Sequence, residues 1–162
     1  MNPETSGARR ERRRTANAIQ MELRDLLGQL SILNHWVSAR LGLKDADLNC
    51  LELIGRLGPI SPSALAKRAG VHPATMTGML DRLERDRWIA RDRDPADRRA
   101  VLLRVLPDRG NELYRLYAGM REEMDEISGH YDATQLTVIH DFLRRCTGAG
   151  ERAASGLAND DQ

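Results

Sequence analysis

The chain has 162 residues, of which 41% are hydrophobic, and its formal net charge is +1 at pH 7. This length and composition predict one globular domain. No apolar run reaches the roughly 18 residues of a transmembrane helix, and the arginine-rich start lacks the apolar segment of a signal peptide, so no membrane partner is expected. Cys50 and Cys146 have neither metal-binding nor redox spacing, which predicts free thiols in a reducing cytoplasm.

The charge is unevenly distributed along the chain. Residues 61–105 contain ten basic and six acidic residues, a net charge of +4, whereas residues 1–60 carry +2 and residues 106–162 carry −5. Phosphate contacts act within about a Debye length, roughly 10 Å. The local surplus of residues 61–105 therefore bears more on nucleic-acid binding than the total charge does.

The first 60 residues predict a tail and two helices. Residues 1–14 are expected to be a disordered basic tail or a frayed helix start, solvated rather than in a specific contact. One long helix is expected over residues 15–41, because its apolar residues recur at alternating steps of three and four: Ile19, Leu23, Leu26, Leu30, Leu33 and Val37. Asp45 or Asp47 caps the next helix, which buries Leu48, Leu51, Ile54 and Leu57.

Two short helices joined by a glycine are expected next. Ser61 is suited to cap a helix with Pro62 at its first position, and Gly70 is suited to end it. Pro73 opens a second helix, in which one apolar stripe is formed by Met76, Met79, Leu80 and Leu83. This order is typical of a helix-turn-helix that places its second helix in the major groove of DNA.

The opposite face of that second helix carries the candidate base contacts. Ala74, Thr75, Thr77 and Gly78 are small or hydroxylated, so the backbone can approach base edges and a methyl group can touch a thymine methyl. Arg82 and Arg85 lie further along the helix and suit phosphates. Taken alone, this segment is equally consistent with an ordinary amphipathic surface helix.

A hairpin with an arginine-rich tip favours the DNA-binding interpretation. Residues 88–91 and 100–106 are expected to be strands, and Asp94-Pro95 is a turn signal between them. The arginines near the tip are Arg91, Arg93, Arg98 and Arg99. A charge run is usually a solvated turn, but here it follows a helix-turn-helix directly, and arginine is favoured in a narrow minor groove.

The remaining chain predicts two more helices and a tail. A heptad-like spacing links Leu113, Tyr117, Met120, Met124, Ile127 and Tyr131, and a last helix is expected over residues 132–146. Residues 148–162 are expected to be disordered. These apolar faces exceed what a small winged domain can bury, which predicts a homodimer formed by the two ends of the chain; the alternative is packing within one protomer.

At these residues the chain resembles the MarR family of bacterial transcription regulators, in which a winged helix-turn-helix sits within an all-helical dimer. LAKRAGVHPATMTGMLDRLERDRWI resembles the third and fourth helices of the family, and RDPADRRAVLLRVLPDRGNEL its wing and the start of its fifth helix. The resemblance implies a mainly α fold with a small β-hairpin wing over residues 15–147. The DNA-reading head is then about residues 58–106, and the dimerisation helices are about 15–41 and 108–147.

The resemblance also implies roles for individual residues. His72, Thr75 and Thr77 fall at the major-groove end of the recognition helix, Arg99 is the wing arginine of the minor groove, and Asp97 steadies the wing. The chain departs from the family at Gly78, where many members have arginine, and at Pro107, which replaces a threonine cap and makes Asp108 the expected cap and dipole partner.

Members of this family often release DNA when a small aromatic or phenolic effector binds between the dimer helices and the reading head. Asn34, His35 and Trp36 lie in the corresponding region near the end of the first long helix. Trp36 offers a stacking face, His35 a titratable donor and Asn34 a neutral hydrogen-bonding group, which together suit a planar acid. The alternative is that Trp36 packs beside Val37 while His35 and Asn34 are solvated.

Other functional classes fit less well. Glu122, Glu123, Asp125 and Glu126 lie on a helix face opposite apolar residues, as a solvated face does, and His140-Asp141 stands without a nucleophile motif, phosphate-binding loop or metal spacing. No catalytic residue, metal site or cofactor is therefore expected. The chain is predicted to bind double-stranded DNA as a homodimeric, ligand-responsive repressor. An architectural DNA-binding protein, or a winged domain used for protein contacts without an effector, stays open.

Overall fold

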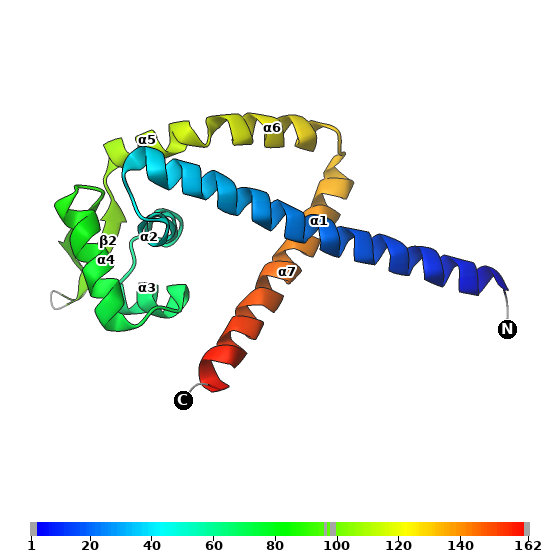
Figure 1. Ribbon diagram of the computed structural model, residues 1–162, viewed down its shortest axis with the longest axis horizontal. Coiled ribbons are helices and arrows are strands. Elements are labelled where there is room, and N and C mark those ends of the chain that lie inside the picture. Colours follow the sequence, from blue (N-terminus) through cyan, green and yellow to red (C-terminus); the bar gives the residue numbers. More distant parts are fainter. Residues whose placement is uncertain (1–2, 96, 98–99, 161–162) are drawn as a thin grey trace. The chain divides into compact units, whose positions relative to one another are not determined.

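The computed structural model describes residues 3–95, 97 and 100–160. It is mainly helical, with one β-hairpin (Figure 1). In chain order the elements are α1 (Pro3–Leu41), α2 (Asp45–Leu57), α3 (Pro62–Ala69), α4 (Pro73–Arg85), β1 (Ile89–Arg93), β2 (Val101–Val105), α5 (Pro107–Leu116), α6 (Ala118–Gly129) and α7 (Ala133–Asp160). None of the helices among these residues is long and apolar enough to cross a membrane.

The chain divides into two compact units, residues 1–48 and residues 49–162. In the first unit, α1 already begins at Pro3, so residues 3–14 form the start of this helix, which was the second of the two alternatives, and not a disordered tail. Alanine, arginine and glutamate dominate residues 8–14, and all three have high helix propensity. The run of charged residues is therefore compatible with a helix.

The helix α1 ends at a glycine, and Val37 alone of its predicted apolar stripe is buried. Gly42 adopts a left-handed conformation (φ 67°), and the next amide, of Leu43, donates to the carbonyl of Ser38 at 2.9 Å. Val37 is buried, whereas Ile19, Leu26 and Ile32 are exposed. Within its own unit, the apolar side of α1 is therefore incompletely covered, as is typical of a surface that contacts another surface.

The second unit contains the helix-turn-helix and the hairpin around one small core. Met76, Met79, Leu80 and Leu83 of α4 are buried, as the sequence predicted, together with Leu65 of α3. The other core side chains come from α2, the hairpin and its approach: Cys50, Leu51, Ile54, Trp88, Ile89 and Leu103. The thiol of Cys50 lies 3.7 Å from the sulfur of Met76, so this cysteine is a core residue.

Local chemistry fixes both ends of α3 and the start of α4, as expected. Ser61 accepts a hydrogen bond from the amide of Ala64 at 3.2 Å. Gly70 has a φ of 62°, and the amide of Val71 donates to the carbonyl of Ala66 at 3.0 Å. At the start of α4, His72 is the N-cap and precedes Pro73.

The end of α4 has the same geometry without a glycine. Arg87 has a φ of 58°, its amide donates to the carbonyl of Glu84 at 3.0 Å, and the amide of Trp88 donates to the carbonyl of Leu83 at 2.8 Å. In this hydrogen-bond pattern the left-handed residue is usually glycine, because a residue with a Cβ is strained in that conformation. Trp88 and Leu83 are both buried, which holds the turn in place.

The hairpin is a two-stranded antiparallel sheet in which Ile89 pairs with Val105 and Arg93 with Val101. The connector between α2 and α3 is bonded to it: the amide of Leu103 donates to the carbonyl of Ile60 at 2.8 Å, and the amide of Ile60 to the carbonyl of Leu103 at 3.3 Å. A Cβ added at Gly58 would lie 2.5 Å from the carbonyl oxygen of Ile54, so the chain requires glycine there.

The carboxyl-terminal helices differ from the prediction in three ways. The expected continuous helix is broken at Tyr117, whose hydroxyl donates to Glu52 of α2 at 2.5 Å. Helix α5 begins at Pro107 with Leu106 as N-cap, so Asp108 is not the cap but lies in the first turn, where its charge still suits the helix dipole. The last helix continues to Asp160, so residues 148–160 are not disordered: four alanines favour helix there despite three glycines.

Candidate nucleic-acid interface

The amino-terminal half of α4 presents a small, polar outer surface. Ala74, Thr75 and Thr77 are exposed, while Met76 between them is buried. The helices α3 and α4 and the hairpin lie side by side (Figure 1). The structure thus brings the predicted major-groove residues and the wing together in one compact head.

Two of the predicted contact residues also stabilise the helix that carries them. His72 accepts a hydrogen bond at Nδ1 from the amide of Ala74 (3.3 Å), and the hydroxyl of Thr77 donates to the carbonyl of Pro73 (3.0 Å). Both side chains are exposed at the start of α4, so Nε2 of His72 and the lone pairs of the Thr77 hydroxyl are accessible to a partner. The positive end of the helix dipole lies at the same place, which favours a phosphate there.

Gly78 lies at the centre of the outer face with space around it. A Cβ at this position would meet only the end of the Arg82 side chain, at 3.8 Å. Glycine is therefore not required by packing here, unlike at Gly58. Its effect is to let the backbone of α4 approach a neighbouring surface closely.

An apolar hollow of about 430 Å³ lies beside this face, between α3 and the start of α4. Its lining is mostly aliphatic and includes Ala66, Val71, Met76 and the side of Thr77. An apolar recess beside exposed hydroxyls is the kind of surface that a thymine methyl contacts.

Arginines occupy the carboxyl-terminal part of α4. Arg82 is half-buried on the outer face, and Arg85 is exposed and bonded to the adjacent Asp86 at 3.0 Å. The hydrogen bond to Asp86 raises the pKa of Arg85 above its ordinary value, so this guanidinium is charged at every relevant pH. An exposed pair of this kind is weak, and Arg85 can exchange Asp86 for a phosphate.

At the wing, the structure places two of the predicted residues. Arg93 ends β1 with an exposed side chain, and Asp97 is exposed at the tip, where its carbonyl accepts from the amide of Ala100 at 2.9 Å. Arg98 and Arg99, the other predicted wing contacts, lie outside the described residues.

Arg91, the remaining one of the four arginines predicted near the tip, is directed at α4. Its Nη2 lies 2.6 Å from Asp81 and its Nε 3.4 Å from Glu84, so this arginine ties β1 to the recognition helix. The sequence pattern alone places Arg91 among the tip arginines. The position of Asp81 and Glu84 one turn apart on α4 could have indicated the pairing, since residues at that spacing share a face.

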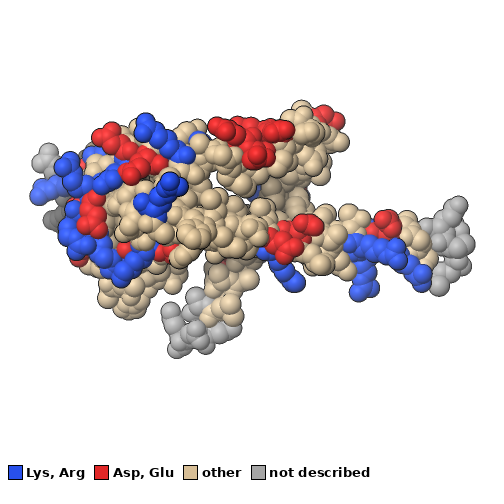
Figure 2. All heavy atoms as spheres, turned by 45° about the horizontal axis from the view of Figure 1, so that its top comes forward, with Lys and Arg blue, Asp and Glu red and all other residues tan. Residues whose placement is uncertain are grey.

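Basic and acidic side chains gather on different parts of the surface. Figure 2 shows lysine and arginine gathered over the helix-turn-helix and hairpin, interspersed with carboxylates, whereas α6 carries a block of carboxylates. Those of α6 are Glu122, Glu123, Asp125 and Glu126, all exposed. The acidic cluster is thus a solvated helix face, and no group of three or more metal-binding side chains occurs in the part of the chain that the structure describes.

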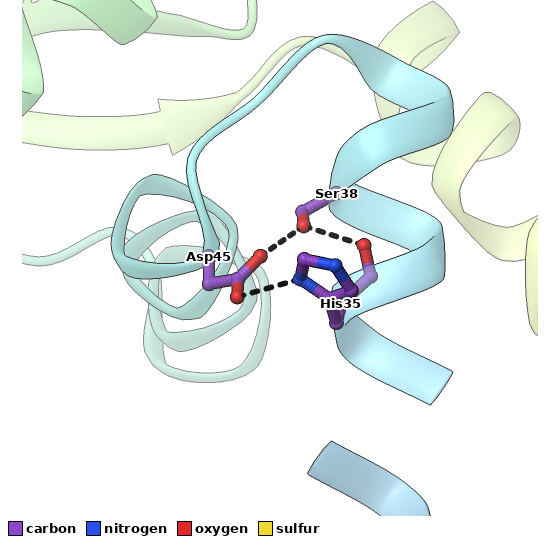
Figure 3. Close-up of polar contacts among 3 residues, drawn as sticks. All are labelled: His35, Ser38 and Asp45. Atoms are coloured by element: carbon purple, nitrogen blue, oxygen red, sulfur yellow. Dashed lines mark hydrogen bonds and ion pairs between the residues drawn. The ribbon is translucent and has the colours of Figure 1, made fainter. Parts of the chain in front are cut away.

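The predicted effector residues lie at the corner between α1 and α2. Asp45 accepts from two sides: Nδ1 of His35 lies 3.0 Å from one oxygen, and the hydroxyl of Ser38 is bonded to the other (Figure 3). The bond from Ser38, and then that from His35, hold the pKa of Asp45 below its ordinary value. Asp45 therefore fastens the end of α1 to the start of α2.

Trp36 and Asn34 have different surroundings. Trp36 is 67% exposed, and its ring meets that of His35 edge to face with a centroid distance of 6.0 Å. Trp36 therefore does not pack into the core beside Val37. Asn34 is half-buried. The structure brings an exposed indole and an imidazole together, but it also commits one nitrogen of His35 to Asp45.

An exposed recognition helix, a preceding helix that supports it and a β-hairpin wing define a winged helix-turn-helix DNA-binding protein. The family model described as "MarR family" matches residues 43–101, which include α3, α4 and β1. The chain is thus similar to the MarR family over these residues, and the comparisons indicate a DNA-binding transcriptional regulator rather than an enzyme.

Individual relatives extend the similarity beyond the reading head. The chain is 29% identical over 154 residues to the uncharacterized HTH-type transcriptional regulator YcgE of Bacillus subtilis, which covers 94% of this chain and 97% of that protein. It is 28% identical to the HTH-type transcriptional repressor YetL of Bacillus subtilis over 62% of this chain and 60% of that protein. The transcriptional regulator Tm0710 of Thermotoga maritima has the same fold, with a TM-score of 0.59 and 29% identity over 86% of this chain and 98% of that one.

Proposed function

We propose that the chain is a cytoplasmic, homodimeric repressor that binds a palindromic operator and releases it when a small aromatic or phenolic acid binds. The exposed, small-residue face at the start of α4, beside the wing, is the observation that carries the proposal. Repression is supported by the printed name of YetL, and ligand response by the resemblance to the family.

In this proposal, each part of the head has a separate role in DNA recognition. His72, Ala74, Thr75, Thr77 and Gly78 contact base edges in the major groove. Arg82 and Arg85 hold phosphates, and Arg93, Arg98 and Arg99 reach the minor groove while Asp97 steadies the wing. Because the chain has one such head, two copies related by a two-fold axis would read half-sites about 34 Å apart.

Dimerisation is supported by apolar faces that lack cover within each unit. Ile19, Leu26 and Ile32 are exposed in α1, and Ile127, Val138 and Leu143 in α6 and α7. Light scattering at micromolar concentration is expected to give twice the mass of the chain. A stable monomer at that concentration, or a footprint that covers a single half-site, would contradict this arrangement.

The DNA-binding assignment is tested with a site selected from random duplexes. Arg99→Ala is expected to weaken operator binding by about 1–3 kcal/mol and to relax the preference for an A·T-rich flank. Arg85→Ala should instead weaken binding to all DNA sequences alike. It should lower the slope of log affinity against log salt concentration by about one unit, which corresponds to one phosphate contact. An Arg99→Ala protein that binds like wild type at physiological salt would show that the wing does not enter the minor groove.

The effector assignment places a planar carboxylate against Trp36, near His35 and Asn34. Such a ligand releases DNA only if it binds the DNA-free conformation more tightly than the DNA-bound one. Aromatic carboxylates are therefore titrated while Trp36 fluorescence is followed in a Trp88→Phe background. If a carboxylate releases DNA equally well from Trp36→Ala, the effector binds elsewhere.

A further inference from the structure

The start of α1 is a dense basic segment that the reading head does not account for. Five of the six residues from position 9 to position 14 are arginine, and the structure places them all on the helix with exposed side chains. Within the described residues, no carboxylate forms an ion pair with any of the five. We refer to residues 7–15 as the basic arm.

Helix geometry separates the charges of the basic arm. Successive residues are about 100° apart, so the arginines cover an arc of about 200° centred on Arg13. Glu11 falls on the opposite side of the helix, and Glu22, three turns later, falls on that side too. The arm therefore has a continuous cationic face with no carboxylate on it.

The basic arm has no apolar face to bury. Its only aliphatic side chain is that of Ala8, and the first large apolar residue of α1 is Ile19. A helix that binds a lipid surface needs an apolar face opposite its basic one, and a helix that packs on a protein needs an apolar seam. The arm has neither, so its chemistry fits a partner recognised by charge alone.

We propose that the basic arm binds the phosphate backbone of duplex DNA outside the operator bases. Duplex DNA carries one negative charge per about 1.7 Å of axis. The arm extends about 7.5 Å from Arg9 to Arg14, a length that faces on the order of four charges. One guanidinium group can donate two parallel hydrogen bonds to two oxygens of a phosphate. All the basic residues of the arm are arginines.

This inference rests on the proposed DNA-binding function and extends it to a second surface. Contacts to phosphates carry no sequence information, so the arm adds affinity for operator and non-operator DNA alike. It also steepens the salt dependence, because each neutralised phosphate releases counterions.

The test compares three full-length proteins on a long duplex that extends beyond the operator on both sides. One is wild type, one has arginines 9, 10, 12, 13 and 14 replaced by glutamine, and the control has the same five replaced by lysine. Both replacements preserve helix propensity, and lysine preserves the charge. Circular dichroism and light scattering check that helix content and oligomeric state are unchanged.

The glutamine variant is expected to lose on the order of 10- to 100-fold in affinity at about 0.1 M salt, and its salt slope should fall by about 2–4 units. The ratio of operator to non-operator affinity stays the same, and the lysine variant keeps the wild-type slope. An unchanged slope in a glutamine variant that still binds the operator would overturn the role of the arm and leave the reading head intact. A change of oligomeric state in that variant would also overturn it. Failure of wild type to select any DNA would instead refute the proposed function.

Discussion

Arg91 on β1 and Asp81 on α4 are joined by an ion pair of 2.6 Å, and Glu84 lies 3.4 Å from the same guanidinium. The wing and the recognition helix are thereby connected by side chains as well as by the turn between them. An arginine held in this way favours one position of β1 relative to α4.

Arg91→Gln should therefore change DNA binding through the position of the wing and not through a lost phosphate. We expect operator affinity to fall by about 0.5–1 kcal/mol with no change in salt slope. In unfolding experiments, a double-mutant cycle with Asp81→Asn should give a coupling of about 0.5 kcal/mol. A salt slope that falls by about one unit would show that Arg91 binds a phosphate.

Two glycines predict opposite effects of alanine on stability. Gly58→Ala brings a Cβ to 2.5 Å from the carbonyl of Ile54 and should cost about 1–3 kcal/mol in the free energy of unfolding. Gly78→Ala meets only the flexible end of Arg82 and should stabilise α4 by about 0.5–1 kcal/mol. Denaturant unfolding without DNA measures both; a loss of stability in Gly78→Ala would contradict the open environment of that residue.

Because Arg87 has a left-handed conformation, we expect glycine at this position to make the folded chain more stable. Arg87→Gly should raise the free energy of unfolding by about 1 kcal/mol, because φ of 58° strains any residue with a side chain. Gly70→Ala, at the equivalent end of α3, is the matched control and should lower stability by a similar amount. Equal stability of Arg87→Gly and wild type would mean that the turn relaxes in solution.

The contacts of Asp45 predict a loss of stability in acid. Its pKa is lowered in the folded chain, so its contribution is present above the ordinary value of 3.8 and is lost as the pH falls through the folded value. The stability difference between wild type and Asp45→Asn should therefore shrink from about pH 6 to about pH 2. Asp25→Asn, elsewhere on α1, is the control and should give a difference that does not follow this course.

Features set by neighbouring residues could be predicted from the sequence. The cap at Ser61, the end of α3 at Gly70 and the buried stripe of α4 depend on local conformation and periodicity, and the structure has all three. The hairpin was predicted for the same reason, with its strands shifted by one or two residues.

Features that depend on tertiary contacts could not be predicted in this way. The break at Tyr117 coincides with its bond to Glu52, which is 65 positions away, and periodicity does not report such a contact. The pairing of His35 with Asp45 is of the same kind. The left-handed Arg87 was missed because the usual signal, a glycine, is absent from that position.

The two hydrogen bonds between Ile60 and Leu103 make the connector after α2 an extension of the hairpin. The segment that follows the carboxyl end of α2 is therefore hydrogen-bonded directly to β2. These contacts join backbone atoms. A displacement at the end of α2 would therefore reach the wing without being taken up by a change of side-chain rotamer. A substitution that moves the connector at Ile60 is therefore expected to displace β2 as well.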